Sequence, residues 1–414
     1  MVYFVFIYFL LAFIFIIRRR GIDISACIIG IYMLTSLCSI YLVNNVSGYA
    51  SRPPGVIPTI IYCSMITLVT IPFYRFNSTK IREIPKVNPR VFNILSWTLI
   101  CGFVFSFLLF WDDIIIRLAY GQEIGQLRGE AGGGLGTAQA ALSGPIRALS
   151  SLFMTILSLS PISFILFFYS ITFLRKKWYF NVLLFLSSFG CLIASVIGID
   201  RSVFFYWIID FIFIYVMFKP YLTSRVKKYI FLLGVAIIAL ASTYLLMVTM
   251  SRFNGREMDS FFDYMGQNYL NFCWFWNNYD APITNWGILC PITSHFIGID
   301  WGAPVDAVSF GHYVEDKVGY FVNYFYTFMG TVMLYLGQWA VIPFCILFYC
   351  ISNKLLNKRL YFGVQSFIRV FILAVVPYCG VILYLYVDYI RFLAALIMLC
   401  FCYFMDKRSI YNYQ

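Results

Sequence analysis

Two histidines are the residues of this chain best suited to move a proton near neutral pH. His295 and His312 are the only histidines, and both lie in one polar stretch, residues 250–328. An imidazole changes charge close to neutral pH, so either could act as a general acid or base. A structural histidine with satisfied hydrogen bonds is the alternative for each. Asp200, in a short turn between two apolar runs, is a third candidate base.

Arginine is the residue type here that suits a phosphate ligand. A guanidinium holds phosphate or carboxylate through two parallel hydrogen bonds and stays charged at any relevant pH. The strongest candidates are Arg201 beside Asp200, Arg252 directly after an apolar run, and Arg128 ahead of a glycine-rich segment. Two further arginines, Arg256 and Arg391, are candidates for substrate binding. The alternative for each arginine is an ion pair with a nearby acid.

Aromatic rings crowd the same stretch, 250–328. Six residues at helical spacing predict an amphipathic helix in the outer membrane interface: Phe261, Met265, Tyr269, Phe272, Trp276 and Tyr279. Asn268, Asn271 and Asn278 fall on the flank of this helix, and a capping box at Ser260–Asp263 is predicted near its start.

The rings of this helix are also candidates for binding sugar. Trp274, Trp276 and Tyr279 have flat apolar faces and polar edges, which suit sugar rings. Tryptophan and tyrosine also concentrate at membrane interfaces whatever their function, so both interpretations stay open.

Other kinds of chemistry find little support. The spacing of metal ligands and the nucleophile elbow are both missing, and we expect neither a metal nor another cofactor. Asp112 and Asp113 form an acidic pair of the kind that membrane glycosyltransferases use on a lipid-linked donor, but they follow the fourth apolar run rather than the first. Cys273 and Cys290 could form a disulfide if their side of the membrane is oxidising.

The composition is that of a polytopic membrane protein. Of 414 residues, 62% are hydrophobic and 12% are charged, which excludes a set of soluble domains. The mean hydropathy is +0.82. The net charge of +12 would suggest nucleic acid in a soluble protein, but here it must be divided between the two sides of a membrane. We therefore expect membrane lipids, and no nucleic acid, as partners.

Apolar runs near 20 residues long, enough to cross a hydrocarbon core of about 30 Å, define the elements that carry these residues. We predict an all-α polytopic membrane protein, a single integral domain over residues 1–414, with two large external loops at 111–151 and 250–328. The eleven predicted spans are 1–17, 24–44, 56–74, 91–110, 152–173, 179–198, 203–218, 230–249, 329–351, 362–385 and 389–405.

The connections between these spans alternate in charge. One side carries 20 basic residues against three acids, and the other carries nine against 14. The positive-inside rule places the first side in the cytoplasm, so the N-terminus is predicted outside and the C-terminus inside. Eight of the nine external basic residues are arginine, which favours an anionic ligand there. Within the spans, Asp210 and Arg369 are predicted to pair, because a lone charge in lipid is costly.

This pattern resembles the Wzy-type polymerases of O-antigen and oligosaccharide repeat units. The resemblance covers nearly the whole chain: the plan of eleven to twelve spans, the two external loops and several short motifs. The motifs are Ile-Asp-Arg201-Ser, Leu-Arg128-Gly, Ser-Arg252-Phe and the segment Asn323-Tyr-Phe-Tyr-Thr327-Phe. The Arg-x10-Gly motif of some members has no counterpart after an external arginine.

The resemblance implies a ligase-like membrane glycosyltransferase of the bacterial inner membrane, with a periplasmic N-terminus and a cytoplasmic C-terminus. It would polymerise undecaprenyl-pyrophosphate-linked repeat units into O-antigen, capsular or exopolysaccharide, without metal. A chain-length regulator protein is a further implied partner. Arg128, Arg201 and Arg252 are the implied catalytic arginines. An O-antigen ligase, or a flippase or transporter for lipid-linked oligosaccharide, is the alternative.

Overall fold

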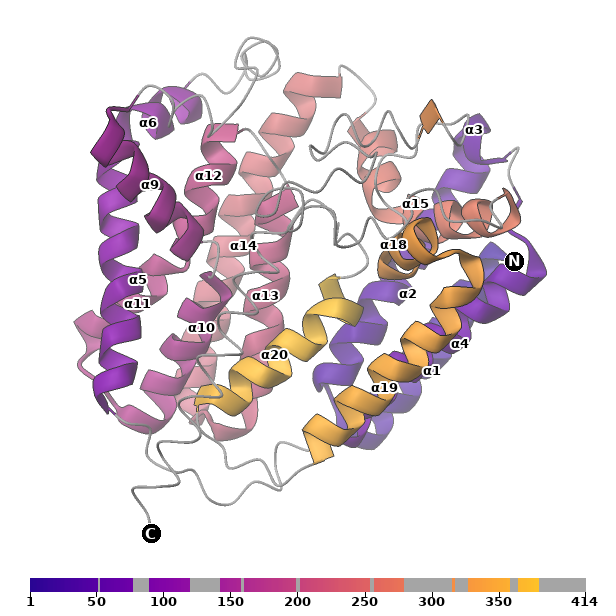
Figure 1. Ribbon diagram of the computed structural model, residues 1–414, viewed down its shortest axis with the longest axis horizontal. Helices are drawn as coiled ribbons and strands as arrows, with labels where there is room; N and C mark the ends of the chain where they lie inside the picture. Colours follow the sequence, from indigo (N-terminus) through magenta and orange to yellow (C-terminus); the bar gives the residue numbers. More distant parts are fainter. Residues whose placement is uncertain are drawn as a thin grey trace. The chain divides into compact units, whose positions relative to one another are not determined.

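The computed structural model of this protein is helical throughout the part that it describes. That part comprises residues 1–50, 53–76, 89–119, 142–157, 160–198, 202–253, 257–278, 315–316, 327–357 and 364–379, and it contains no strand. The chain divides into two compact units (Figure 1). Unit 1 comprises Met1–Asn77, Met258–Leu360 and Val370–Phe392, and unit 2 comprises Ser78–Glu257, Tyr361–Arg369 and Leu393–Gln414.

The described part of unit 1 is built on the apolar helices α1, α2, α4 and α19. The helix α1 packs on α2 and α4, and α4 also packs on α2 and α19. Its described helices are α1 (Val2–Arg20), α2 (Ile24–Asn45), α3 (Ser47–Ala50), α4 (Val56–Arg75), α15 (Glu257–Asn278), α18 (Thr327–Leu336) and α19 (Val341–Asn357). A short 3-10 turn, Gln338–Ala340, joins α18 to α19, and the second half of α20 (Val364–Cys379) also belongs here. Tyr32 in α2 donates a hydrogen bond to the carbonyl of Pro377 in α20.

Unit 2 is a second helical group with an aromatic interior. Its helices are α5 (Pro89–Leu109), α6 (Trp111–Ala119), α9 (Gly144–Leu157), α10 (Ser160–Tyr169), α11 (Trp178–Ser187), α12 (Gly190–Gly198), α13 (Ser202–Phe218) and α14 (Ser224–Phe253), with the first part of α20. Between α10 and α13, Phe164 meets Trp207 with ring centroids 5.0 Å apart, and Phe168 stacks on Phe218 at 5.6 Å. These ring contacts hold α10 against α13.

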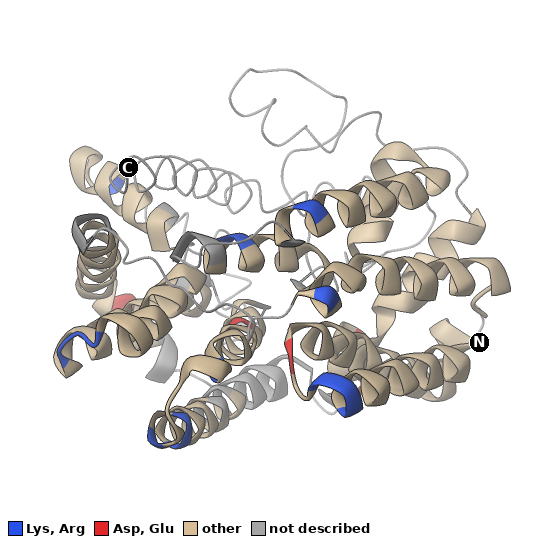
Figure 2. Ribbon diagram, turned by 90° about the horizontal axis from the view of Figure 1, so that it is seen from below, with Lys and Arg blue, Asp and Glu red and all other residues tan. Residues whose placement is uncertain are grey.

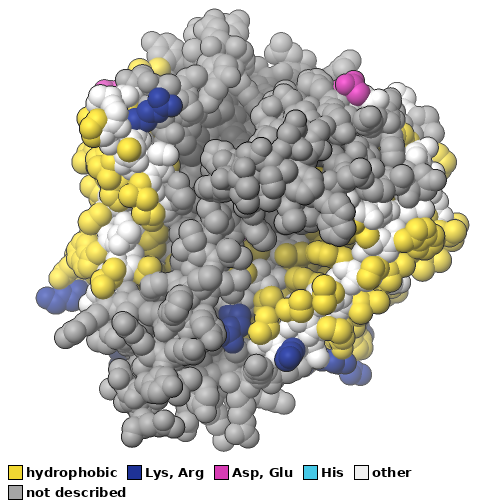
Figure 3. Space-filling model, in the orientation of Figure 1, with side chains coloured by type: hydrophobic (Ala, Val, Ile, Leu, Met, Phe, Trp, Pro, Cys, Tyr) yellow, Lys and Arg dark blue, Asp and Glu magenta, His cyan; other side chains and the backbone are white. Residues whose placement is uncertain are grey.

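Within the described residues, seven helical segments are long and apolar enough to cross a membrane. They are Val2–Arg20, Ile24–Asn45, Val56–Arg75, Phe92–Leu109, Trp178–Ile197, Val203–Tyr221 and Gln338–Leu356. Many of their apolar side chains point outward, such as Leu11 at 61% exposure and Leu347 at 59%. Figure 3 shows how much of the described surface is hydrophobic. Such a surface requires lipid rather than water, which confirms the predicted class, a polytopic α-helical membrane protein.

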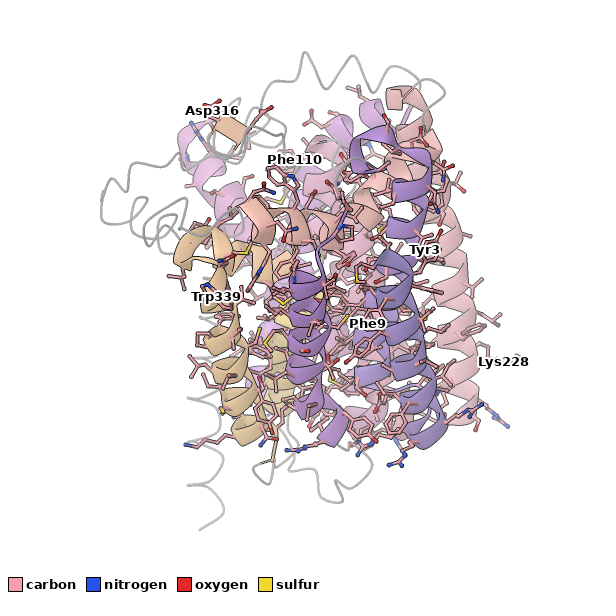
Figure 4. All side chains as sticks on the ribbon, turned by 90° about the vertical axis from the view of Figure 1, so that its right-hand side faces the viewer. Tyr3, Phe9, Phe110, Lys228, Asp316 and Trp339 are labelled. Atoms are coloured by element: carbon pink, nitrogen blue, oxygen red, sulfur yellow. The ribbon has the colours of Figure 1, made fainter. Side chains whose placement is uncertain are left out.

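The described positive residues of unit 1 gather at one end of its helices. Arg20 donates from Nη1 to the carbonyl of Phe76 at 3.3 Å, and Arg75 donates from Nη1 to the hydroxyl of Tyr349 at 3.0 Å. The basic ends of α1, α4 and α19 therefore meet. Figure 2 shows Lys and Arg at the ends of several helices, and Figure 4 shows Tyr3 and Asp316 at the opposite end of unit 1. This arrangement agrees with the charge alternation, while the absolute orientation stays a prediction.

Some predicted elements differ from the observed ones. The predicted span 329–351 is broken at Gly337, whose φ of 87° turns the chain between α18 and α19. The predicted external loop 111–151 is helical at both ends, as α6 and α9. Residues 389–405 lie outside the described residues, so the count of eleven spans stays a prediction. So does the pairing of Asp210, which is buried in α13, with Arg369 in α20.

Candidate functional site

The polar helix α15 lies against the membrane helices of unit 1 along one face. At about 100° per residue, Phe262, Gly266, Tyr269, Cys273 and Trp276 fall within one arc of this helix. Gly266 makes the closest approach, because a Cβ at this position would lie 2.6 Å from the carbonyl carbon of Cys38 in α2. At the same place Ser39 donates its hydroxyl to the carbonyl of Gly266. The absence of a side chain at Gly266 therefore allows α15 to touch the backbone of α2.

Two tyrosines hold the N-terminal half of α15. Tyr41 in α2 stacks on Phe262 with centroids 4.0 Å apart and donates its hydroxyl to Asp259 at 2.9 Å. Tyr49 in α3 donates its hydroxyl to Asp263 at 2.5 Å. The capping-box prediction was wrong, because the helix begins at Glu257 and Ser260 lies inside it. Asp263 instead joins α15 to α3 by accepting the hydrogen bond from Tyr49.

The C-terminal half of α15 is held by buried aromatic contacts. The hydroxyls of Tyr269 and Thr59 in α4 lie 2.6 Å apart, and the Tyr269 ring meets Tyr62 at 5.1 Å. Trp276 meets Trp339 edge-on at 5.4 Å. Nearby Cys273 is a buried free thiol, and its predicted partner Cys290 lies outside the described residues. Polar and aromatic contacts thus position the full length of α15.

The contact between Asp263 and Tyr49 has a consequence for pH dependence. Burial raises the pKa of the Asp263 carboxyl above its ordinary value, while the hydrogen bond from Tyr49 lowers it by less. At pH values between the ordinary and the raised pKa, Asp263 keeps its proton in the folded protein but releases it in the unfolded chain. Stability from this group is therefore fully present below the ordinary pKa and is lost as the pH rises through the raised one.

Replacing Asp263 with asparagine should remove this dependence. We expect the Asp263→Asn variant to gain stability relative to the parent as the pH rises through that window, because the amide has no charge to desolvate. Thermal unfolding of both purified proteins across the acidic range measures the difference. Asp316, which is exposed and for which no burial effect is expected, provides the control substitution Asp316→Asn. A constant difference across the range would contradict the prediction.

The opposite face of α15 carries carboxamides that are also buried. Asn268 is 0% exposed, Gln267 1% and Asn271 3%. Asn271 donates from Nδ2 to Oε1 of Gln267 at 3.1 Å, and Asn268 donates from Nδ2 to the carbonyl of Met265 at 3.1 Å. The helix was predicted with these asparagines on its flank, and the structure confirms the helix. Gln267 had not been singled out, although its i, i+4 spacing to Asn271 was visible.

The predicted site residues fall into three groups. Trp274 and Trp276 lie on α15, where Trp276 is buried. Arg252 lies in the last turn of α14, of which only the backbone is described there. The remaining predicted residues lie outside the described part of the chain: Arg128, Asp200, Arg201, Arg256, Tyr279, His295, His312 and Arg391. Where these residues lie relative to α15 therefore stays a prediction.

The fold defines a polytopic α-helical membrane protein in which a polar helix is docked on the membrane helices of one unit. Among the described residues no group of three histidine, cysteine or acidic side chains could hold a metal ion. No protein-family model, no curated protein and no solved structure matches the chain.

Proposed function

We propose that this protein is a membrane glycosyltransferase that polymerises undecaprenyl-pyrophosphate-linked oligosaccharide repeat units. It would act in the bacterial inner membrane, with its N-terminus and its two large loops on the periplasmic side. The product would be an O-antigen, capsular or exopolysaccharide chain. The proposed reaction uses no metal or other cofactor.

The docking of α15 is the observation that carries the proposal. A helix with nine aromatic or carboxamide residues from Tyr264 to Trp276 is held firmly beside apolar membrane helices. A lipid-linked oligosaccharide likewise has an apolar part and a polar part. Its polyprenyl chain belongs in lipid, and its sugars need aromatic faces and hydrogen-bonding groups. The basic ends of α1, α4 and α19 lie at the opposite end of unit 1, as expected if α15 faces the periplasm.

The proposed chemistry transfers a growing chain to a new repeat unit. A hydroxyl of the incoming sugar attacks the anomeric carbon of the growing chain, and the bond from that carbon to the pyrophosphate breaks. The hydroxyl proton passes to a base, for which His295, His312 and Asp200 are the candidates. Arg201, Arg252 and Arg128 stabilise the negative charge on the departing undecaprenyl pyrophosphate.

Lysine substitution tests the arginines of this site. Arg252→Lys and Arg201→Lys each keep the positive charge but lose the two-pronged hydrogen bonding, so we expect long polymer to fall by about 10-fold or more. Gel analysis of polysaccharide from a deletion strain carrying each variant measures this. Arg225→Lys, at the other end of α14, is the matched control and should leave polymer unchanged. Polymer of normal amount and length from both test variants, at equal expression, would contradict phosphate recognition.

The deletion strain itself separates the proposed activity from its nearest alternatives. Loss of a polymerase leaves a single repeat unit on the acceptor, whereas loss of a ligase leaves none. Loss of a flippase leaves the repeat unit on the cytoplasmic face, where periplasmic enzymes cannot reach it. Only the first outcome agrees with the proposal.

A further inference from the structure

The carboxamide face of α15 contains buried polar atoms without partners. Oδ1 of Asn268 and Nε2 of Gln267 are buried, and neither has a hydrogen-bond partner among the residues that the structure describes. A buried polar group that is left unpaired destabilises the folded protein. Folded proteins satisfy nearly all such groups, so two on adjacent residues of one helix require an explanation. A ligand that supplies the missing partners is one.

These two atoms lie on the side of α15 that faces away from α2 and α4. At about 100° per residue, Gln267, Asn268 and Asn271 fall within an arc of about 100°, roughly opposite the arc of Phe262, Gly266 and Tyr269. The docking contacts described above use only the second arc.

The free atoms define the chemistry of a suitable ligand. One is a hydrogen-bond acceptor and the other is a donor, and neither carries a charge. A sugar hydroxyl or acetamido group offers both a donor and an acceptor, whereas a phosphate offers only acceptors at neutral pH. Phe275 is buried on the same face and Trp274 lies beside it, so this face also offers the apolar surface of aromatic rings to a sugar.

The geometry points to a sugar-binding subsite on this face of α15, in which Asn268 and Gln267 hydrogen-bond to the repeat unit rather than to the pyrophosphate. This inference rests on the proposed function, since it names the part of the substrate that α15 recognises. It divides the substrate between two groups of residues: the arginines hold the diphosphate, and the carboxamides hold the sugar.

Substitution of Asn268 by leucine tests the subsite. Leucine has nearly the same shape but cannot accept a hydrogen bond. The probes are undecaprenyl pyrophosphate and the undecaprenyl-pyrophosphate-linked repeat unit extracted from the deletion strain, each titrated into the purified full chain in lipid nanodiscs. In the parent protein the glycosylated lipid should bind more tightly than the bare lipid. Asn268→Leu should lose about 10-fold in affinity for the glycosylated lipid alone.

Stability measurements separate this role from a structural one. Asn268→Leu removes an unpaired buried oxygen, so its unfolding temperature should equal or exceed that of the parent. Asn278 makes the same kind of bond to its own helix, from Nδ2 to the carbonyl of Trp274, but is exposed. Asn278→Leu is therefore the matched control and should change neither affinity. Gln267→Met, which removes the free donor, is the second test variant and should repeat the selective loss.

The outcomes distinguish the subsite from the proposed function. If the parent binds neither lipid, the proposed function fails and the subsite fails with it. If the parent prefers the glycosylated lipid and both Asn268→Leu and Gln267→Met keep that preference, only the subsite is overturned. An equal loss of affinity for both lipids would also overturn the subsite, because a sugar contact does not affect binding of the bare lipid. A lower unfolding temperature together with weaker binding would overturn it as well, because a sugar contact does not affect the fold.

Discussion

Replacing Gly266 with alanine is expected to separate α15 from α2 and to lower the free energy of unfolding by about 3 kcal/mol. The new Cβ would lie 2.6 Å from the carbonyl carbon of Cys38, 2.7 Å from the nitrogen of Ser39 and 2.8 Å from the carbonyl oxygen of Cys38. All three are backbone atoms of a membrane helix, so no rotation of a side chain can make room.

The contacts along α15 would be lost together. Moving the helix outward breaks the bond from Ser39 to the carbonyl of Gly266 and lengthens the 2.6 Å contact between Tyr269 and Thr59. The hydroxyl of Tyr269 would then lose its contact with Thr59, which adds to the steric cost. Ser39 and Thr59 would keep their bonds to the carbonyls of Thr35 and Gly55. Because the proposed function needs α15 in place, long polymer should also disappear in a deletion strain complemented with this variant.

Thermal unfolding of the purified full chain measures the effect of Gly266→Ala. Gly48→Ala is the matched control, because Gly48 also belongs to unit 1 and a Cβ there would meet nothing within 4 Å. The control should unfold at the parent temperature. If Gly266→Ala does so as well, the close approach between α15 and α2 is not a feature of the protein.

The long spans were the most predictable part of the fold. The predicted runs 1–17, 24–44 and 56–74 correspond to α1, α2 and α4 with ends that differ by three residues at most. Continuous apolar runs bounded by charged, glycine or proline residues determine these helices locally, because lipid forces the backbone to satisfy its own hydrogen bonds. The helix in the polar stretch was also predictable, from the spacing of Tyr269, Phe272 and Trp276.

The candidate site was less predictable, because its geometry depends on contacts between distant parts of the chain. Ser39 and Gly266 are 227 positions apart in the sequence. Other residues of α15 are separated from their partners in unit 1 by similar numbers of residues, and no local pattern indicates such pairings. Asn268 was predicted on the flank of the helix, and its side-chain type gave no sign of burial, since a polar side chain usually faces water. Its burial, and the unpaired atom that follows from it, emerged only from the packed structure.

Gly337 illustrates why one predicted span failed. Residues 329–351 are apolar enough to form one continuous helix, and glycine alone inside such a run is tolerated at a cost of about 1 kcal/mol. The sequence therefore offered no strong signal for a break. In the structure Gly337 ends α18 with φ of 87° and ψ of 163°, and α19 starts in a new direction after one turn.

Replacing Gly337 with alanine should therefore lower the free energy of unfolding by about 2 kcal/mol, because this combination of φ and ψ is essentially restricted to glycine. Alanine favours the right-handed helix, so it would pull α18 and α19 toward the single helix that the hydropathy pattern predicts. The side chains of α18 from Thr327 to Tyr335 are all buried, and such a change would expose them. Thermal unfolding measures the cost, with Gly144→Ala as the control, because Gly144 has open space around its Cβ position and no positive φ. If Gly337→Ala unfolds at the temperature of this control, the turn at Gly337 does not divide the two helices.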